Sequence, residues 1–298
     1  MNFLEYKNIP CNLCGSNDYK ILYKKVYSFE PDRIKITTDM YNSYGQIVRC
    51  KRCGLVYTTP RFPNNQIIQA YKSMDDRDYV SEQESRNINA QFSLHTIKKY
   101  KKQGTLLDIG SACGFFLNSA KKDFEVSGVE LSHWATEFTR RTWGINVFEG
   151  TLEELQLKPS SVDVVSMIDT LEHLTDPQST VAEVYKILKL NGLFYLVVPD
   201  IDGLAAKILR GYWWGLRPAH LYYFSKNSLT QLLKKNGFKI KQMKSYGRVF
   251  PYSYWLSRLH HYPKLIYKTV KYVVDAFALN EKLAYINTKD SLEIVAVR

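Results

Sequence analysis

Four of the five cysteines form two pairs of a type that can hold a metal ion. Each pair has two residues between its cysteines and a glycine directly after it, in Cys11-Asn-Leu-Cys14-Gly15 and Cys50-Lys-Arg-Cys53-Gly54. This spacing turns both sulfurs toward one ion, and four thiolates in a tetrahedral array select Zn²⁺ without leaving an open position. We therefore expect a structural zinc site, with candidate ribbon strands at 20–29 and 32–39. A redox pair or a disulfide is the alternative, and the two matched pairs disfavour both.

A second group of residues indicates a nucleotide site. Residues 105–109 have the apolar composition of a strand and lead into a turn that contains Gly110 and Gly114, where the backbone can pass close to a ligand. Glu130 ends the next expected strand, 22 residues after Asp108, where a carboxylate can accept hydrogen bonds from both ribose hydroxyls. Asp108 would repel the pyrophosphate of a dinucleotide, whereas its carboxylate suits a sulfonium or ammonium cation.

This stretch resembles the cofactor core of the class I S-adenosylmethionine (SAM)-dependent methyltransferases. The family's first motif is an acid, any residue, then Gly-x-Gly-x-Gly, in which Ala112 replaces the middle glycine here. The resemblance implies a Rossmann-like α/β sheet, mostly parallel with a closing antiparallel strand, and SAM as the methyl donor. The residues that it places at the cofactor are Asp108, Gly110, Ala112, Cys113, Gly114, Glu130, Leu131, Ser132, Trp134, Gly150, Thr151, Leu152, Asp169 and Thr170. The four-cysteine block resembles a subgroup associated with sugar and secondary-metabolite methylation.

Residues after the fourth and fifth strands of such a sheet face the methyl acceptor, because ligands lie at the carboxyl edge of the strands. Methylation of an oxygen gains from a base that takes the hydroxyl proton. His173, five residues after the expected strand 162–168, is the first candidate base, and His220 is the second. Glu172 could orient an imidazole ring or contact the cofactor. The alternative for His173 is a histidine that only packs against or caps the next helix.

The segment that carries His220 is rich in aromatic side chains. Trp and Tyr faces can stack on sugar rings or bases, and an arginine can hold a phosphate. The predicted substrate contacts are Trp213, Trp214, Arg217, Tyr222 and Tyr223. The alternative is a hydrophobic lid whose indoles pack inward, and a lid that also binds substrate would satisfy both interpretations.

Strands alternating with helices must position these residues, a pattern that predicts right-handed crossovers and a mostly parallel sheet. We expect a zinc-ribbon block over 1–60 and a helical linker or cap over 61–103. A SAM-binding methyltransferase domain then follows over 104–298, with a helical insertion at 249–290.

The chain is basic, with a net charge of +12, which favours acidic partners such as RNA, an anionic membrane surface or a phosphorylated small molecule. Within 252–279, apolar residues recur at helical spacing among lysines and aromatic residues. This stretch predicts either peripheral contact with an anionic membrane or a cap packed on the domain, or on a second copy in a homodimer. The first residues lack the pattern of a secretory signal, which favours a cytoplasmic location, with the inner membrane face as a peripheral site.

The predicted function is SAM-dependent O-methylation of a sugar, a nucleotide-sugar or a surface-glycan precursor in polysaccharide biosynthesis. Oxygen is preferred because the family's sugar C-methyltransferases are generally longer, with another C-terminal domain. An RNA methyltransferase is the first alternative, supported by the net charge and the zinc ribbon, although no motif of nucleobase methylation is present. A non-catalytic SAM-binding scaffold is the second alternative, motivated by Ala112 and by the lack of an obvious base.

Overall fold

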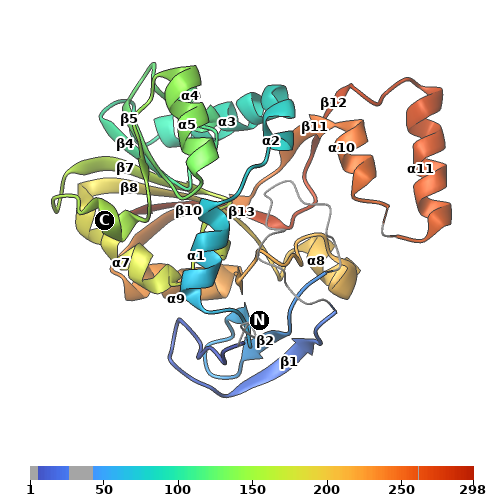
Figure 1. Cartoon of the computed structure of the whole chain (residues 1–298), viewed down its shortest axis with the longest axis horizontal. Helices are drawn as coiled ribbons and strands as arrows, with labels where there is room; N and C mark the ends of the chain where they lie inside the picture. Colours follow the sequence, from blue (N-terminus) through green and yellow to red (C-terminus); the bar gives the residue numbers. More distant parts are fainter. Residues whose placement is uncertain (1–5, 27–42, 261) are drawn as a thin grey trace.

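The computed structural model describes residues 6–26, 43–260 and 262–298. Its centre is a seven-stranded sheet in the order β10-β13-β8-β7-β4-β5-β6 (Figure 1). Its strands in chain order are β4 (Thr105–Ile109), β5 (Glu125–Glu130), β6 (Val147–Glu149), β7 (Val162–Ile168), β8 (Leu188–Pro199), β10 (Lys239–Ser245) and β13 (Ser291–Val297). The five strands from β4 to β8 are parallel, and β13 lies antiparallel between β8 and β10. The predicted Rossmann-like sheet with an antiparallel strand is confirmed.

Helices cover both faces of this sheet, so its central strands are buried on both sides. One core contains α7 (Pro177–Ile187) and α9 (Lys226–Lys235), and the other contains α3 (Gln83–Lys98) and α4 (Phe115–Ala120). In β8, Phe194, Leu196 and Val198 enter the first core, while Leu193, Tyr195 and Val197 enter the second. Side chains of a strand alternate between the two faces, which explains why β8 needs a continuous apolar run. The helices α5 (His133–Trp143) and α6 (Leu152–Leu155) flank β6 in the chain.

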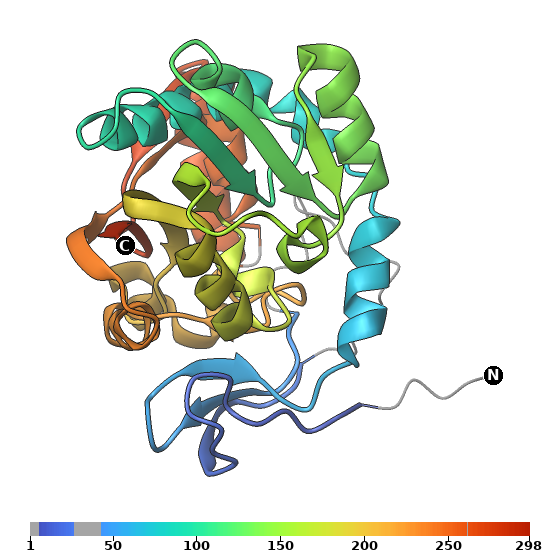
Figure 2. The same ribbon diagram turned by 90° about the vertical axis from the view of Figure 1, so that its left-hand side faces the viewer.

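The N-terminal block folds as a small antiparallel sheet of β1 (Tyr19–Tyr23), β2 (Ile47–Cys50) and β3 (Val56–Thr58). A fourth strand, β9 (Tyr222–Tyr223), joins this sheet from the distant part of the chain by pairing with β3. The block lies below the main sheet in Figure 2 and shares the core that contains α7 and α9. Of the candidate ribbon strands, 20–29 overlaps β1, and 32–39 lies outside the described residues. The block is therefore built into the larger domain by a shared sheet.

Three helices lead from this block to the main sheet, namely α1 (Asn64–Lys72), α2 (Asp78–Ser81) and α3. Figure 2 shows α1 rising from the N-terminal block toward the strands. After the sheet's fifth parallel strand come α8 (Leu204–Leu209) and the 3₁₀ turn η3 (Arg210–Tyr212), and the turn η2 (Leu171–His173) follows β7. The helices expected within 61–103 are thus present, and they bring residues 67–93 to the edge of the sheet where the strands end.

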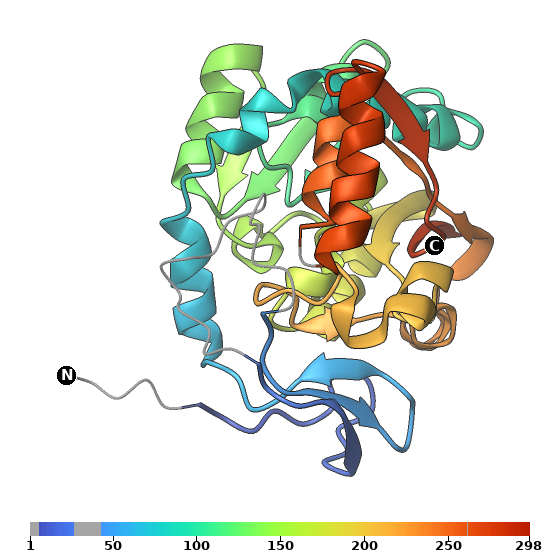
Figure 3. The same ribbon diagram turned by 90° about the vertical axis from the view of Figure 1, so that its right-hand side faces the viewer.

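The insertion before the last strand is a hairpin that encloses two helices. β11 (Arg248–Pro251) pairs antiparallel with β12 (Leu283–Ile286), and α10 (Tyr252–Ser257) and α11 (Lys264–Ala276) lie between them. In Figure 3, α11 faces the viewer along one side of the molecule. Within the described ranges, none of the helices combines the length and the apolar character needed to cross a bilayer.

Candidate active site

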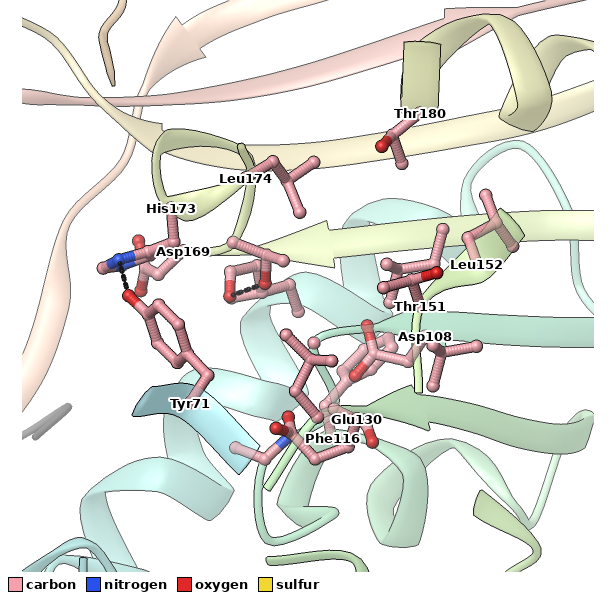
Figure 4. Close-up of a pocket in the computed structure, with 18 of the residues that line it drawn as sticks. Tyr71, Asp108, Phe116, Glu130, Thr151, Leu152, Asp169, His173, Leu174 and Thr180 are labelled. Carbon is pink, nitrogen blue, oxygen red and sulfur yellow. Dashed lines mark hydrogen bonds between the residues drawn. The ribbon is translucent and has the colours of Figure 1, made fainter. Parts of the chain in front are cut away.

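A cavity of about 430 Å³ lies where β4, β5 and β7 end (Figure 4). Residues at the carboxyl ends of these strands line it, including Asp108, Glu130 and Asp169. Side chains from α1, α2, α3 and β11 also contribute to its wall. This is the edge at which open α/β sheets bind ligands. The cavity thus joins the predicted cofactor turn to segments from both ends of the chain.

The turn after β4 has the conformation that its glycines permit. Gly110 has a φ of 74° and Gly114 a φ of 70°, both in the left-handed region. A Cβ on Gly110 would lie 2.4 Å from Thr170 Oγ1, so a larger residue would not fit there. Ala112, in the place of the family's middle glycine, also has a positive φ of 45°. The alanine therefore adopts the conformation that the motif requires, at a cost of about 1–2 kcal/mol relative to a right-handed residue.

Two buried carboxylates face this cavity. Glu130 accepts hydrogen bonds from the backbone N–H groups of Ala112 (2.9 Å) and Ser132 (2.8 Å), which ties the turn to the start of α5. Asp108 accepts one from the Ser166 hydroxyl at 2.7 Å, and burial raises the pKa of Asp108 to about 7. Each carboxylate oxygen has a further lone pair for a ligand. The pair fits SAM, since one acid suits ribose hydroxyls and the other suits a cationic group.

Most of the other predicted cofactor residues also line the cavity, while four do not. Those that line it are Leu131, Gly150, Thr151, Leu152, Asp169 and Thr170, besides Gly110 and Ala112. Those that do not are Cys113, Gly114, Ser132 and Trp134. Ser132 instead caps α5 by accepting from Ala135 N, and its hydroxyl donates to Met74 O at 2.8 Å. Cys113 is 1% exposed and packs with Phe115, which supports the loop, and contact of these four residues with the cofactor stays a prediction.

His173 borders the cavity at some distance in sequence from the cofactor turn. Its Nδ1 lies 3.0 Å from Ala219 O and 2.8 Å from the Tyr71 hydroxyl (Figure 4). A carbonyl oxygen only accepts, so the tautomer that satisfies Ala219 O has its proton on Nδ1 and a lone pair on Nε2. Burial lowers the pKa of His173 to about 4, so the ring is neutral at pH 7. The ring can therefore accept a proton, although its affinity for one is weak.

The other two predicted catalytic residues lie behind His173. Glu172 is 1% exposed, and its Oε1 is 4.0 Å from His173 Nε2. The His220 ring centroid is 4.7 Å from that of His173, at an interplanar angle of 81°. Neither Glu172 nor His220 lines the cavity, and burial lowers the pKa of His220 well below its usual value. The structure thus brings the three residues together, and of the three His173 is the one that lines the cavity.

None of the five predicted substrate contacts lines the cavity, and their role toward a substrate stays a prediction. Trp213 is 1% exposed, and its indole N–H donates to Asp290 Oδ2 at 2.7 Å. Tyr222 and Tyr223 form β9 and are buried against β3. The aromatic segment packs inward between the N-terminal block and the main sheet, because the pairing of β9 with β3 buries its side chains. Its partly buried members are Trp214 and Arg217, and Arg217 Nε donates to Trp214 O.

Several residues that complete the cavity had no role assigned to them from local sequence patterns. Tyr71 comes from α1, Arg86 from α3 and Arg248 from β11. Arg248 makes two 2.6 Å hydrogen bonds to the Asp169 carboxylate, and the guanidinium of Arg86 lies 3.3 Å from the centroid of the Tyr79 ring. Tyr71 and Arg86 lie in the expected helical linker or cap over 61–103, Arg248 directly precedes the expected insertion at 249–290, and no local motif marks them. Only the folding of both segments onto the strand ends brings them to the site.

The four paired cysteines lie in one cluster in the N-terminal block. The four Sγ atoms all lie within 4.8 Å of one another. The Cys11 and Cys53 sulfurs are 3.3 Å apart, and the Cys14 and Cys50 sulfurs are 3.5 Å apart. These distances exceed a disulfide bond of about 2.05 Å, and all four are free. The Gly15 and Gly54 N–H groups donate back to the first cysteine carbonyl of each pair, which forms two similar turns. Four sulfurs at this spacing fit a tetrahedral zinc ion.

Comparisons with known proteins agree with this fold. A family model described as "Methyltransferase domain" matches residues 79–243, more than half of the chain. A Mycolicibacterium smegmatis protein named "Probable S-adenosylmethionine-dependent methyltransferase" is 31% identical over 97 residues, covering 33% of this chain and 36% of that protein. The rice (Oryza sativa subsp. japonica) protein 2-methyl-6-phytyl-1,4-hydroquinone methyltransferase 2, chloroplastic, is 25% identical over 161 residues, covering 52% and 44%. The matched part thus spans less than half the length of these relatives.

A solved structure gives the same result for the fold. The crystal structure of a SAM-dependent methyltransferase from Archaeoglobus fulgidus aligns with a TM-score of 0.53 at 16% identity, over 75% of this chain and 100% of that one. At this identity the similarity concerns the fold alone. The family match, the strand order and the carboxylates at the strand ends lead to one conclusion. The chain belongs to the methyltransferase-domain family and carries a SAM-dependent methyltransferase domain.

Proposed function

We propose that the protein transfers a methyl group from SAM to a hydroxyl of a sugar, a nucleotide-sugar or a surface-glycan precursor. The observation that carries this proposal is the division of the cavity. Asp108 and Glu130 lie at the end suited to SAM, while His173 and Tyr71 form a separate polar group. In SAM the positive sulfur is the leaving group, so the protein must mainly align the acceptor and exclude water.

The lining of the cavity supports a polar acceptor of small size. Tyr71, Tyr79 and Phe250 offer aromatic faces, and Arg86 and Arg248 add two guanidinium groups. The aromatic faces suit stacking on a sugar ring, while the two guanidinium groups are paired with carboxylates of the chain, Arg86 with Glu82 and Arg248 with Asp169. The rice relative is named for a hydroquinone acceptor, and this also supports an acceptor of small-molecule class.

We propose that the acceptor hydroxyl lies beside His173 and that Nε2 is the atom placed to take its proton. Of the two candidate histidines, only His173 borders the cavity. Its low proton affinity sets a limit, because a base with a pKa of about 4 gives little driving force for removing a hydroxyl proton.

Label transfer from methyl-labelled SAM in an extract of the native cell tests the acceptor class. Label in carbohydrate-containing material that survives nuclease would support the proposal. Label released by nuclease would contradict it and support the RNA methyltransferase. No label, with SAM still bound in calorimetry and acceptor-rich glycan fractions added, would support the non-catalytic scaffold.

We also propose that the four cysteines hold a structural zinc ion and that the block belongs to the sugar and secondary-metabolite subgroup. The ion would fix the two turns and, through β2 and β3, the strand β9. The block reaches the predicted acceptor end by direct bonds, because Thr58 N donates to Leu221 O and Leu221 N donates to Glu172 O, both at 2.9 Å. Metal analysis of the purified chain, with and without Cys50→Ser, tests the zinc.

The helix α11 supports our proposal of a peripheral contact with an anionic membrane. Leu265, Tyr272 and Phe277 are 77%, 74% and 69% exposed, and Lys264 and Lys268 lie on the neighbouring face. A wide apolar face flanked by lysines suits the interface of an anionic bilayer. Co-sedimentation with anionic and neutral vesicles, comparing the wild type with Leu265→Ser/Phe277→Ser, tests it. Equal sedimentation would contradict the proposal, and a concentration-dependent dimer lost in the variant would support the homodimer instead. The cytoplasmic location stays a prediction.

A further inference from the structure

Glu172, His173 and His220 form a cluster of metal-ligand type separate from the four cysteines. One ligand atom of each residue lies within 4.8 Å of the others. Two of these residues come from the turn after β7 and one from the segment before β9, so chain folding alone brings them together. Two histidines and one carboxylate are a donor set that binds divalent transition metals.

The buried polar atoms of this cluster lack partners. Both carboxylate oxygens of Glu172 and the Nδ1 of His220 make no hydrogen bond within the described part of the chain. Glu172 is 1% exposed and His220 is 6% exposed, so water offers little compensation. A buried carboxylate without partners is costly, and a bound ion is one way in which native proteins satisfy such a group.

Both imidazole rings are also oriented as metal ligands are. His173 uses Nδ1 to donate to Ala219 O, which leaves the lone pair of Nε2 free. His220 hydrogen-bonds the backbone of Gly215, and its Nδ1 has no partner, so the bond falls to Nε2 and the lone pair of Nδ1 is free. A backbone bond at the other nitrogen is the usual support of a metal-bound histidine.

The donor atoms lie close enough to converge on one ion. His173 Nε2 and Glu172 Oε1 are 4.0 Å apart, and two tetrahedral ligands with bonds of about 2 Å lie about 3.3 Å apart, so a small side-chain shift would let both bind the same ion. From these observations we propose that Glu172, His173 and His220 form a second metal site for a divalent transition ion such as Zn²⁺. Because His173 borders the cavity, the ion would lie beside the acceptor end.

This site bears on the proposed base. With an ion bound, Nε2 of His173 would be a ligand and could not take a proton, and an ion next to an acceptor hydroxyl would lower the pKa of that hydroxyl instead. The metal site itself rests on the cluster's geometry and not on the class of acceptor. A readout of metal content therefore separates it from the proposed function.

Metal stoichiometry tests the proposal. The full chain is stripped of metal, saturated with Zn²⁺, freed of excess ion and analysed by mass spectrometry for zinc per chain. We expect Glu172→Gln and His220→Ala each to lose one ion relative to the wild type, while the cysteine site keeps its own ion in both variants. His95→Ala, a change of an exposed histidine on α3, is the matched control and should keep the wild-type number.

Cobalt provides a second readout on the unaltered chain. Co²⁺ at a site without thiolates should give visible bands that lack the sulfur charge-transfer absorption of the cysteine site. SAM binding measured by calorimetry identifies variants that have failed to fold. The proposal is overturned if the saturated wild type shows only a thiolate-bound cobalt, or if folded Glu172→Gln and His220→Ala variants keep every ion of the wild type.

Discussion

The two ends of the cavity are built in different ways. The cofactor end comes from one continuous stretch, in which Asp108, the glycine turn and Glu130 lie within 23 residues. The acceptor end is assembled from α1, the turn η2, residues near β9 and the strand β11. The first end has an internal hydrogen-bond frame, since Glu130 bonds the backbone at Ala112 and Ser132. The second depends on contacts between distant parts of the chain.

This difference predicts which function is lost first when the N-terminal block is disrupted. The N-terminal block contacts the acceptor end through β9 and through Asn12, which donates to Asp176 Oδ1 at 2.8 Å and accepts from Gln178 N at 3.0 Å. None of the residues of the cysteine block lines the cavity in the described structure. Loss of the block should therefore disturb acceptor binding and catalysis before it disturbs the binding of SAM.

Removal of the cysteine ligands should give the largest effect. A four-thiolate zinc site contributes on the order of 10 kcal/mol to folding, so Cys50→Ser/Cys53→Ser should lose its zinc and unfold the block. We expect methyl transfer to be abolished while SAM affinity falls by less than about tenfold, as measured by label transfer and calorimetry. Cys113→Ser, outside the cluster, is the control and should keep the zinc. An equal loss of SAM binding and turnover would remove the distinction between the two ends.

Truncation of His173 should lower turnover much more than SAM affinity, with a smaller total effect than loss of the cysteine ligands. A residue that activates the acceptor typically contributes 10²–10⁴-fold, about 3–5 kcal/mol, so His173→Ala should lower kcat by that factor. Because His173 has Tyr71 and Ala219 as its hydrogen-bond partners and not the Asp108–Glu130 pair, SAM affinity should change by less than about threefold. His95→Ala is again the matched control. Full turnover in both His173→Ala and His220→Ala would show that neither histidine acts on the acceptor.

The pH dependence of the free energy of unfolding should reveal the raised pKa of Asp108 at the cofactor end. Burial raises the pKa of Asp108 from 3.8 to about 7, so folding favours its protonated form. The stabilisation of the folded state by protonated Asp108 is fully present below about pH 4 and is lost as the pH rises through 7. The unfolding free energy of the wild type should then fall by up to about 4 kcal/mol relative to Asp108→Asn between pH 4 and 7.

Urea titrations at several pH values measure this difference. A cationic ligand should favour the ionised carboxylate, so SAM binding near pH 6 should release a proton in the wild type and release less in Asp108→Asn. Calorimetry in two buffers with different ionisation enthalpies detects the proton. Parallel stability profiles for the two proteins would show that Asp108 is ionised throughout.

The smallest effect is expected at Ala112. Its φ of 45° is strained for alanine, so Ala112→Gly should stabilise the chain by about 1 kcal/mol and leave the rest of the turn unchanged. Thermal unfolding measures the gain. Ala135→Gly within α5 is the opposite control and should destabilise by a similar amount, because glycine weakens a helix. A loss of stability in Ala112→Gly would mean that the turn has another conformation in solution.

The outcome for the aromatic segment shows the limit of local patterns. Residues 213–223 combine Trp, Tyr and Arg side chains, which suit either a sugar platform or a packed core. Which of the two forms depends on whether the edge of β3 is free to pair with this segment. The residues near position 222 contain no information about that distant edge. Tyr222 pairs with Tyr57, more than 160 residues away, and is buried there, as the packed-core interpretation expects.

The sequence by itself determined the sheet and the cofactor turn. Alternating side chains, apolar runs and glycines at positive φ are local properties, because each depends on residues a few positions apart. Tertiary structure decided the acceptor end, including the entry of Tyr71 and Arg248 into the cavity, the meeting of Glu172 with His220 and the burial of Trp213. These depend on which distant strands and helices pack together, and such packing is set by the burial of surface over the whole chain.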